Sequence, residues 1–184
     1  MTRKQLFRYW HVEVLGGIDR KFSLWKLWRR AVKHSGRGYV FWFRLAQYFY
    51  AKDSITLKSM GKWINRRLVR RYSVEIMLGV DIGEGLWVGH PIGIVVNSGC
   101  SIGKNFSIRQ NTTIGTTETR LGMHEVIHIG DNVSVGANSC IVGTGLTIGD
   151  NVTIGAMSFV NKDVPSNCVY VTVKEFRVLR ASEG

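Results

Sequence analysis

Histidine is the residue type in this sequence best suited to proton transfer near neutral pH, because the imidazole changes charge close to that range. His90 stands out because Pro91, one of only two prolines in 184 residues, follows it directly. A neighbouring proline favours a turn over the interior of a regular element. His90 is therefore a candidate general base, and a buried structural histidine is the alternative. The five histidines are His11, His34, His90, His124 and His128.

A second group of chemically capable side chains lies between residues 115 and 128. This stretch interrupts the regular pattern described below, and interruptions of a regular array often carry function. We therefore expect a loop here that supplies residues to the site. Its titratable members are Glu118, Arg120, His124, Glu125 and His128.

The three cysteines form neither a disulfide framework nor a metal-ligand pattern. Cys100, Cys140 and Cys168 are odd in number and far apart, and no second ligand stands at metal-binding spacing. The longest apolar run, residues 39–43, is far shorter than a membrane span. We expect free thiols, no metal cofactor and a cytoplasmic protein.

In the second half of the chain, aliphatic residues recur every six positions, and this repeat indicates the element that positions the candidate residues. Such a repeat has to be identified before helices or strands are assigned. The period shifts by two residues after Ile94 and breaks after Ile114. The repeated aliphatic positions are Ile76, Ile82, Val88, Ile94, Val96, Ile102, Ile108, Ile114, Ile129, Val135, Ile141, Ile148, Ile154 and Val160.

Most of these aliphatic residues precede glycine or a small polar residue, which neither a helix nor a long alternating strand explains. A short strand that points one β-branched side chain inward and then turns a corner does explain it. Three such hexads close one triangular coil, and stacked coils share an aliphatic core. The repeat predicts a mainly β protein with a parallel β-helix over residues 75–165; a β-sandwich fits less well because its strands alternate over longer stretches.

Residues 75–178 resemble the hexapeptide-repeat acyltransferases, in particular the serine acetyltransferase branch and its relatives from surface-polysaccharide biosynthesis. Three segments carry the resemblance: Gly-His-Pro-Ile-Gly-Ile-Val-Val at 89–96, Ser-Ile-Arg-Gln-Asn-Thr-Thr-Ile-Gly at 107–115, and Asn-Lys-Asp-Val-Pro at 161–165. The resemblance implies a left-handed coil, a homotrimer with active sites between subunits, and direct acetyl transfer from acetyl-CoA to a hydroxyl group.

The resemblance also implies roles for individual residues. His90 takes the place of the catalytic histidine, and Glu75 that of an acid which orients the imidazole and stabilises its charged form. His124 is our choice for a second active-site histidine, with His128 as the alternative. Gln110 and Arg120 are assigned to the substrate. Acetyl-CoA binding is assigned to Gly136, Ala137, Gly155 and Ala156 along the pantetheine chain, and to Lys162 and Arg177 at the phosphates.

The acceptor is expected to be a hydroxyl group of a surface polysaccharide or its precursor. Serine acetyltransferases carry an Asp before the catalytic histidine and an Arg before the second one, where this chain has Gly89 and Met123. Unpaired polar ends of a buried substrate are costly, so free serine should bind poorly. Arg120 can replace the missing Arg, which keeps serine as the alternative. A trimeric scaffold without catalysis is the alternative from another class.

Residues 1–74 are predicted to be a basic, aromatic, helical region, and residues 166–184 a C-terminal extension. Residues 1–75 hold 18 Lys and Arg against four acids, and five of the six tryptophans. Such helices can lie on an anionic membrane surface, which for a cytoplasmic protein would be that of the inner membrane. Alternatively, their aromatic side chains can pack on the coil or on a trimer partner. Pairing of trimers through these helices stays open. No nucleic-acid motif accompanies the charge, so nucleic-acid binding is not expected.

Overall fold

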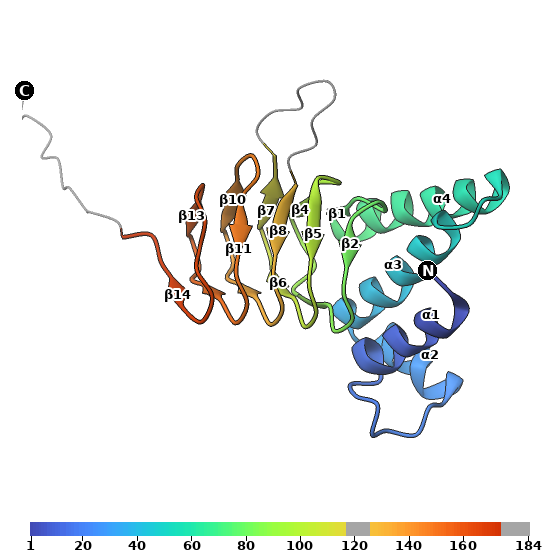
Figure 1. Ribbon diagram of the computed structural model, residues 1–184. Helices are drawn as coiled ribbons and strands as arrows, with labels where there is room; N and C mark the ends of the chain where they lie inside the picture. Colours follow the sequence, from blue (N-terminus) through green and yellow to red (C-terminus); the bar gives the residue numbers. More distant parts are fainter. Residues whose placement is uncertain (117–125, 174–184) are drawn as a thin grey trace, which may run out of the picture.

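The computed structural model describes residues 1–116 and 126–173, which form a helical region followed by a three-sided coil (Figure 1). The helical region begins with a capping box, in which the Gln5 backbone N–H donates to Thr2 Oγ1 and the Thr2 N–H to Gln5 Oε1. Its helices are α1 (Arg3–Tyr9), the π-helical turn η1 (Trp10–Val14), α2 (Leu24–Lys33), α3 (Ser35–Tyr50) and α4 (Ile55–Tyr72).

The coil consists of short parallel strands that stack in three sheets. Within the described residues the sheet orders are β1-β4-β7-β10-β13, β2-β5-β8-β11 and β3-β6-β9-β12-β14. The strands are β1 (Val74–Ile76), β2 (Asp81–Ile82), β3 (Trp87–Gly89), β4 (Ile94–Val96), β5 (Cys100–Ile102), β6 (Ser107–Arg109), β7 (Thr113–Gly115), β8 (Ile127–Ile129), β9 (Ser134–Val135), β10 (Cys140–Val142), β11 (Thr147–Ile148), β12 (Thr153–Ile154), β13 (Phe159–Val160) and β14 (Val169–Tyr170).

The predicted left-handed parallel β-helix with an N-terminal helical segment is confirmed. Every aliphatic residue of the six-residue repeat is buried in one continuous core. Backbone N–H groups donate to the next coil, as from Gly83 to Ile102 O at 2.9 Å and from Gly103 to Ile129 O at 2.8 Å. The repeat is therefore the pattern of inward-pointing residues, one for each side of the triangle.

One corner of the coil is lined by a ladder of asparagines in the left-handed region. Asn105, Asn132, Asn151 and Asn167 have φ between 55° and 61°, a conformation that Asn tolerates better than most residues. Their side-chain amides hydrogen-bond from coil to coil at 2.8–2.9 Å. The ladder satisfies polar groups that a bare turn would leave to solvent.

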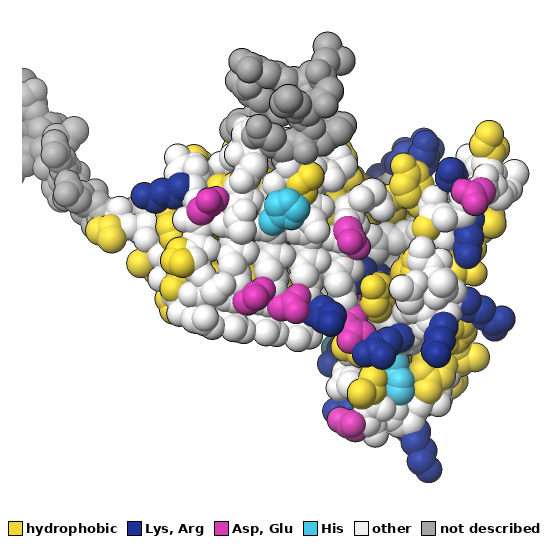
Figure 2. Space-filling model, in the orientation of Figure 1, with side chains coloured by type: hydrophobic (Ala, Val, Ile, Leu, Met, Phe, Trp, Pro, Cys, Tyr) yellow, Lys and Arg dark blue, Asp and Glu magenta, His cyan; other side chains and the backbone are white. Residues whose placement is uncertain are grey.

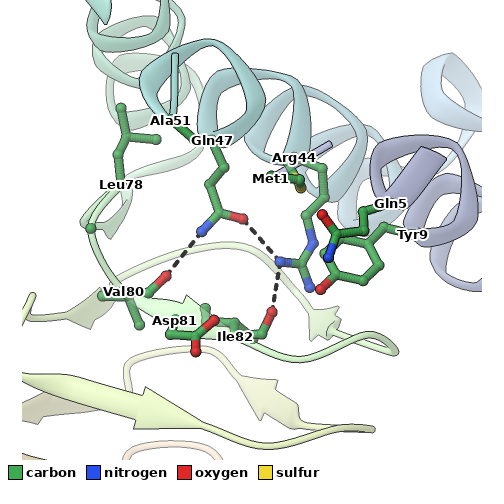
Figure 3. A pocket seen from close by; sticks show the side chains of 11 residues that line it. Met1, Gln5, Tyr9, Arg44, Gln47, Ala51, Leu78, Val80, Asp81 and Ile82 are labelled. Atoms are coloured by element: carbon green, nitrogen blue, oxygen red, sulfur yellow. Dashed lines mark hydrogen bonds between the residues drawn. The ribbon is translucent and has the colours of Figure 1, made fainter. Parts of the chain in front are cut away.

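The helical region packs on the first coil through apolar residues of α3 and α4 that join the core of the coil, and through a buried ion pair. Arg44 on α3 donates to Glu13 Oε1 at 2.7 Å and Oε2 at 3.0 Å, and both side chains are almost fully buried. Figure 3 shows the Arg44 guanidinium also donating to Ile82 O and to Gln47, whose amide donates to Val80 O. Glu13 in turn accepts the backbone N–H groups of residues 85 and 86. These contacts fix α3 and η1 against the start of the coil.

Basic and acidic side chains are distributed unequally between the helical region and the coil. Figure 2 shows basic side chains gathered over the helical region and acidic ones along the coil. No helix among residues 1–116 and 126–173 has the length and apolarity needed to cross a bilayer. At the other end, β14 pairs with β12, so the third sheet extends into the segment that we took as a C-terminal extension from residue 166.

Candidate active site

His90 lies in a turn that is two residues longer than the equivalent turns of the coil. Gly89 pairs with Arg109, and Val95 pairs with Thr113. The segment between the paired residues is 90–94 in the first coil and 110–112 in the second, so the first is two residues longer. The turn is tight, because the Ile92 N–H donates to His90 O at 2.7 Å. The extra residues explain the two-residue shift of the repeat.

The geometry of this turn leaves the His90 side chain accessible. His90 has φ of 52°, in the left-handed region, which is uncommon for a residue other than glycine or asparagine. Its side chain is exposed, whereas Pro91 beside it is buried. The alternative of a buried structural histidine is therefore wrong for His90.

A cavity of about 430 Å³ opens beside His90, between the coil and the junction of α2 with α3. Lys33, His34 and Arg37 line it from the helical side, and Trp87 and His90 from the coil. The helical side lies close to the coil because the first turn of α3 packs directly on β3. The contact is so tight that a Cβ atom added at Gly36 would lie 2.2 Å from the carbonyl oxygen of Val88. Glu13 also lines the cavity but is paired with Arg44, so the unpaired charges of Lys33 and Arg37 remain and suit an anionic group.

Lys33 and Arg37 were missed by the sequence reasoning. Both belong to the helical region, more than fifty residues before His90 in the chain. The glycines on either side of Arg37 were the available signal, because a glycine inside a helix often marks close packing. Only the docking of α3 shows which surface they approach.

The same corner of the coil carries Gln110 and Ala137 in successive layers below this turn. The Asn111 N–H donates to Ile92 O at 3.0 Å, and the Asn138 N–H donates to Gln110 O at 3.0 Å. The Gln110 side-chain oxygen is buried and has no hydrogen-bond partner among the described residues. A buried acceptor without a donor is costly, which makes it a candidate for a ligand contact.

The four expected cofactor-binding residues along the coil divide into two kinds. The Gly136 and Gly155 N–H groups donate to Ile154 O and Tyr170 O, so they are already used by the coil. A Cβ at Gly136 would lie 2.4 Å from the Ala156 nitrogen, so this glycine is needed for stacking. The Ala137 and Ala156 N–H groups have no partner among the described residues. The alanines are the residues that offer donors to a ligand.

Glu75 lies on the adjacent face of the coil. It pairs with Val95 in the first sheet, and its side chain is exposed. The Gly93 N–H donates to Ser73 O at 2.8 Å, which places the beginning of β1 beside the turn that holds His90. Within the described residues, however, no hydrogen bond joins the Glu75 carboxylate to the His90 imidazole. Its pairing with His90 stays a prediction.

The remaining candidates are not at this corner or are not described. Lys162 is exposed in the turn after β13, at the far edge of the first sheet. His128 is a solvent-facing residue of β8 in the second sheet, between Ser101 and Thr147. His124, Arg120 and Arg177 lie outside the described residues. In residues 1–116 and 126–173, no three side chains of the metal-binding types converge.

Comparison with known proteins connects this arrangement to one class of enzyme. Residues 126–162 match the family model described as the hexapeptide repeat of succinyl-transferase. The mitochondrial serine acetyltransferase 3 of Arabidopsis thaliana is 37% identical over 122 residues, which cover 66% of this chain and 30% of that protein. The serine acetyltransferase of Staphylococcus epidermidis is 38% identical over 117 residues, covering 61% of this chain and 53% of the relative.

Solved structures agree with the fold. Soybean serine acetyltransferase complexed with serine superposes with a TM-score of 0.76 at 24% identity, covering 92% of this chain and 68% of that one. In its repeat and its coil, the chain is similar to hexapeptide-repeat acyltransferases. The particular members it resembles are serine acetyltransferases. The chain spans 30–57% of the length of the first curated relatives.

These relatives overturn the expected acceptor. The polysaccharide branch and the saccharide acceptor are wrong, because the similar curated proteins and structures are serine acetyltransferases. Two missing charged residues, at Gly89 and Met123, were part of the basis for expecting a saccharide. In the structure, Lys33 and Arg37 bring positive charge to the cavity beside His90 from another part of the fold.

Proposed function

We propose that this chain is an acetyl-CoA-dependent O-acetyltransferase whose acceptor is the hydroxyl group of serine. The observation that carries the proposal is the similarity of the coil to serine acetyltransferases at 37–39% identity. His90, exposed in the lengthened turn, supplies a group suited to the chemistry. Because the chain covers only part of those relatives, its activity has to be measured directly.

In the proposed reaction His90 acts as general base. An imidazole nitrogen takes the proton of the serine hydroxyl while the oxygen attacks the thioester carbonyl. The C–S bond then breaks, the acetyl group stays on the serine oxygen, and the imidazolium returns its proton to the CoA sulfur. Glu75 orients the imidazole and stabilises its charged form, which requires that the side chain approach His90 in the complex.

Acetyl-CoA is proposed to lie along the corner of the coil below His90. The unpaired N–H groups of Ala137 and Ala156 are placed at successive layers of that corner and can donate to amide carbonyls of an extended chain. Lys162, with Arg177 in the undescribed segment, would contact phosphate groups. Acceptor contacts would come from the unpartnered Gln110 oxygen and from Arg120.

The serine carboxylate is proposed to bind Lys33 and Arg37. Both line the cavity that contains His90, and neither forms an ion pair with a described acidic residue. A charge-assisted hydrogen bond to a carboxylate is roughly twice as strong as a neutral one. This contact would replace the charged residues that are absent from positions 89 and 123.

The active form is proposed to be a homotrimer with the site between neighbouring subunits. Large apolar side chains remain exposed on the sides of the coil, including Trp87, Val95 and Phe159. Surfaces of this kind are often covered in an oligomer. Light scattering after gel filtration measures the mass directly, and a stable monomer would contradict this part of the proposal.

The function is tested by incubating the full chain with acetyl-CoA and L-serine and identifying O-acetylserine by mass spectrometry. L-Serine amide, which lacks the carboxylate, should react at least tenfold more slowly, because a charge-assisted contact contributes about 1.5–3 kcal/mol. Arg37→Gln should reduce that preference, whereas Arg66→Gln on exposed α4 serves as the matched control. Absence of O-acetylserine under all conditions would contradict the proposal and favour a non-catalytic scaffold.

A further inference from the structure

The exposed side of α2 is more apolar than its packing in the molecule requires. Leu27 is buried against the rest of the helical region, as is Ala31. Four other apolar residues are each more than 60% exposed: Leu24, Trp25, Trp28 and Val32. Their spacing places them on one side of the helix, next to the buried side. The apolar residues of α2 therefore form one stripe with a buried half and an exposed half.

The exposed stripe continues onto the neighbouring helices. A cavity of about 390 Å³ is lined by Val32 of α2, Trp42 of α3 and Trp63 of α4. Trp42 and Trp63 are about half-exposed. We call the combined surface the tryptophan face, formed by Leu24, Trp25, Trp28, Val32, Trp42 and Trp63.

Positive charge surrounds the tryptophan face. The Arg29 guanidinium lies 5.0 Å from the ring centroid of Trp25, and that of Arg67 lies 4.3 Å from Trp63. Arg71 lines the cavity. Residues 1–74 contain 18 Lys and Arg and three acids, one of which is the buried Glu13. Within the described residues, only two cations of this region form ion pairs, Arg8 and Arg44.

This combination limits what can cover the tryptophan face. A second copy docking by the same face would bring like charges together, which disfavours a symmetric interface. An anionic bilayer matches both features of the tryptophan face: its apolar layer accommodates Trp and Leu, and its negative headgroups attract Lys and Arg. No described helix can span a bilayer, so the contact would be interfacial.

We propose that the tryptophan face docks α2 and the neighbouring ends of α3 and α4 onto the surface of an anionic lipid bilayer. The apolar side chains enter the boundary between headgroups and acyl chains, while Arg29, Arg67 and Arg71 stay at the headgroups. Figure 1 shows the helical region at one end of the coil, so the contact would leave the sides of the coil free. The proposal is independent of the acceptor.

Vesicle flotation tests the proposal with the full-length chain. We expect it to float with phosphatidylcholine vesicles that contain phosphatidylglycerol, weakly with pure phosphatidylcholine, and less at high salt. Trp25→Ser with Trp28→Ser should weaken binding at least about tenfold, because burying one large apolar side chain contributes about 1.5–3 kcal/mol. Val169→Ser, which alters an exposed apolar residue at the far end of the coil, should bind like the unaltered chain.

The charge contribution is tested separately. Arg29→Gln with Arg67→Gln should weaken binding to the anionic vesicles about thirtyfold at low salt, at about 1 kcal/mol per cation. Lys104→Gln on the exposed coil is the control. Equal binding to neutral vesicles, or unchanged binding by both double variants, would overturn the proposal. So would tryptophan-dependent self-association or DNA binding without flotation.

Discussion

The coil and the helical region of this protein are held together in opposite ways. Each layer of the coil repeats the same contacts, an inward aliphatic side chain and backbone hydrogen bonds to the next layer. The helical region is joined to the coil by contacts that occur once: the Arg44–Glu13 ion pair, and apolar side chains of α3 and α4 that enter the core of the coil. Repetition therefore gives the coil many equivalent contacts, while the position of the helices, and with it that of Lys33 and Arg37, depends on a single junction.

The largest predicted effect is the loss of the buried ion pair. Arg44→Met leaves the Glu13 carboxylate buried without its cation, which is expected to cost about 3–5 kcal/mol of folding free energy. The change should release the helical region more than the coil. Urea unfolding followed by tryptophan fluorescence reports the helices, which hold five of six tryptophans, and circular dichroism reports both regions.

The matched control for this prediction is Arg66→Met. Arg66 is exposed and makes no ion pair with a described residue, so its loss should change stability by less than about 0.5 kcal/mol. Equal costs for the two variants would show that Arg44 does not anchor the helices.

The coil should respond similarly wherever an inward aliphatic residue is truncated. Ile108→Ala and Ile154→Ala each remove a fully buried side chain and should each cost about 2–5 kcal/mol. Because each layer contacts only its neighbours, the two costs should agree within about 2 kcal/mol, the usual spread between buried sites. Urea denaturation of both variants measures this. A much larger cost at one position would mean that the coil is not a stack of equivalent layers.

The asparagine ladder should contribute less. Asn132→Ala removes two side-chain hydrogen bonds and puts alanine at a φ of 58°, which together should cost about 2–4 kcal/mol. Asn132→Gly tolerates the backbone conformation, so only the hydrogen-bond loss of about 1–2 kcal/mol should remain. Thermal unfolding of the pair separates the two causes. Identical losses would contradict the role assigned to the left-handed backbone.

The smallest effect concerns the buried Cys100 in the coil. Burial raises the pKa of the Cys100 thiol to about 11. An unfolded chain loses this proton near pH 8.5 and the folded chain does not, so stability should fall as pH rises between about 8.5 and 11. Cys100→Ala should lose less stability over that window. The free energy of unfolding of both proteins is measured by urea denaturation at several pH values. If it falls equally with pH in the two proteins, burial of the thiol is contradicted.

Most of the coil could be predicted from the sequence because inward residues recur every six positions and each contact lies between neighbouring layers. The two-residue shift after Ile94 was visible, although only the register shows that the turn holding His90 is the longer one. The partners of that turn could not be predicted. Arg37 and Gln110 reach the same corner through helix docking and coil stacking, and neither leaves a periodic signal in the chain.

Under the proposed contact of Lys33 and Arg37 with the serine carboxylate, the same limit accounts for the error about the acceptor. The residue types at positions 89 and 123 were read against a family pattern, while positive charge from α2 and α3 was treated as belonging to a separate region. The structure brings both regions to one cavity. A local sequence comparison is therefore a weak guide to substrate charge when the site is assembled from two regions.

The most direct test of the central claim is the rate of CoA release from acetyl-CoA with L-serine, comparing His90→Ala with the unaltered chain. Loss of a general base should lower kcat about 10²–10⁴-fold while acetyl-CoA binding, measured by calorimetry, stays unchanged. His34→Ala, which alters another histidine of the same cavity, should keep most of the activity. Turnover by His90→Ala close to that of the unaltered chain would contradict the assignment of the lengthened turn as the catalytic site.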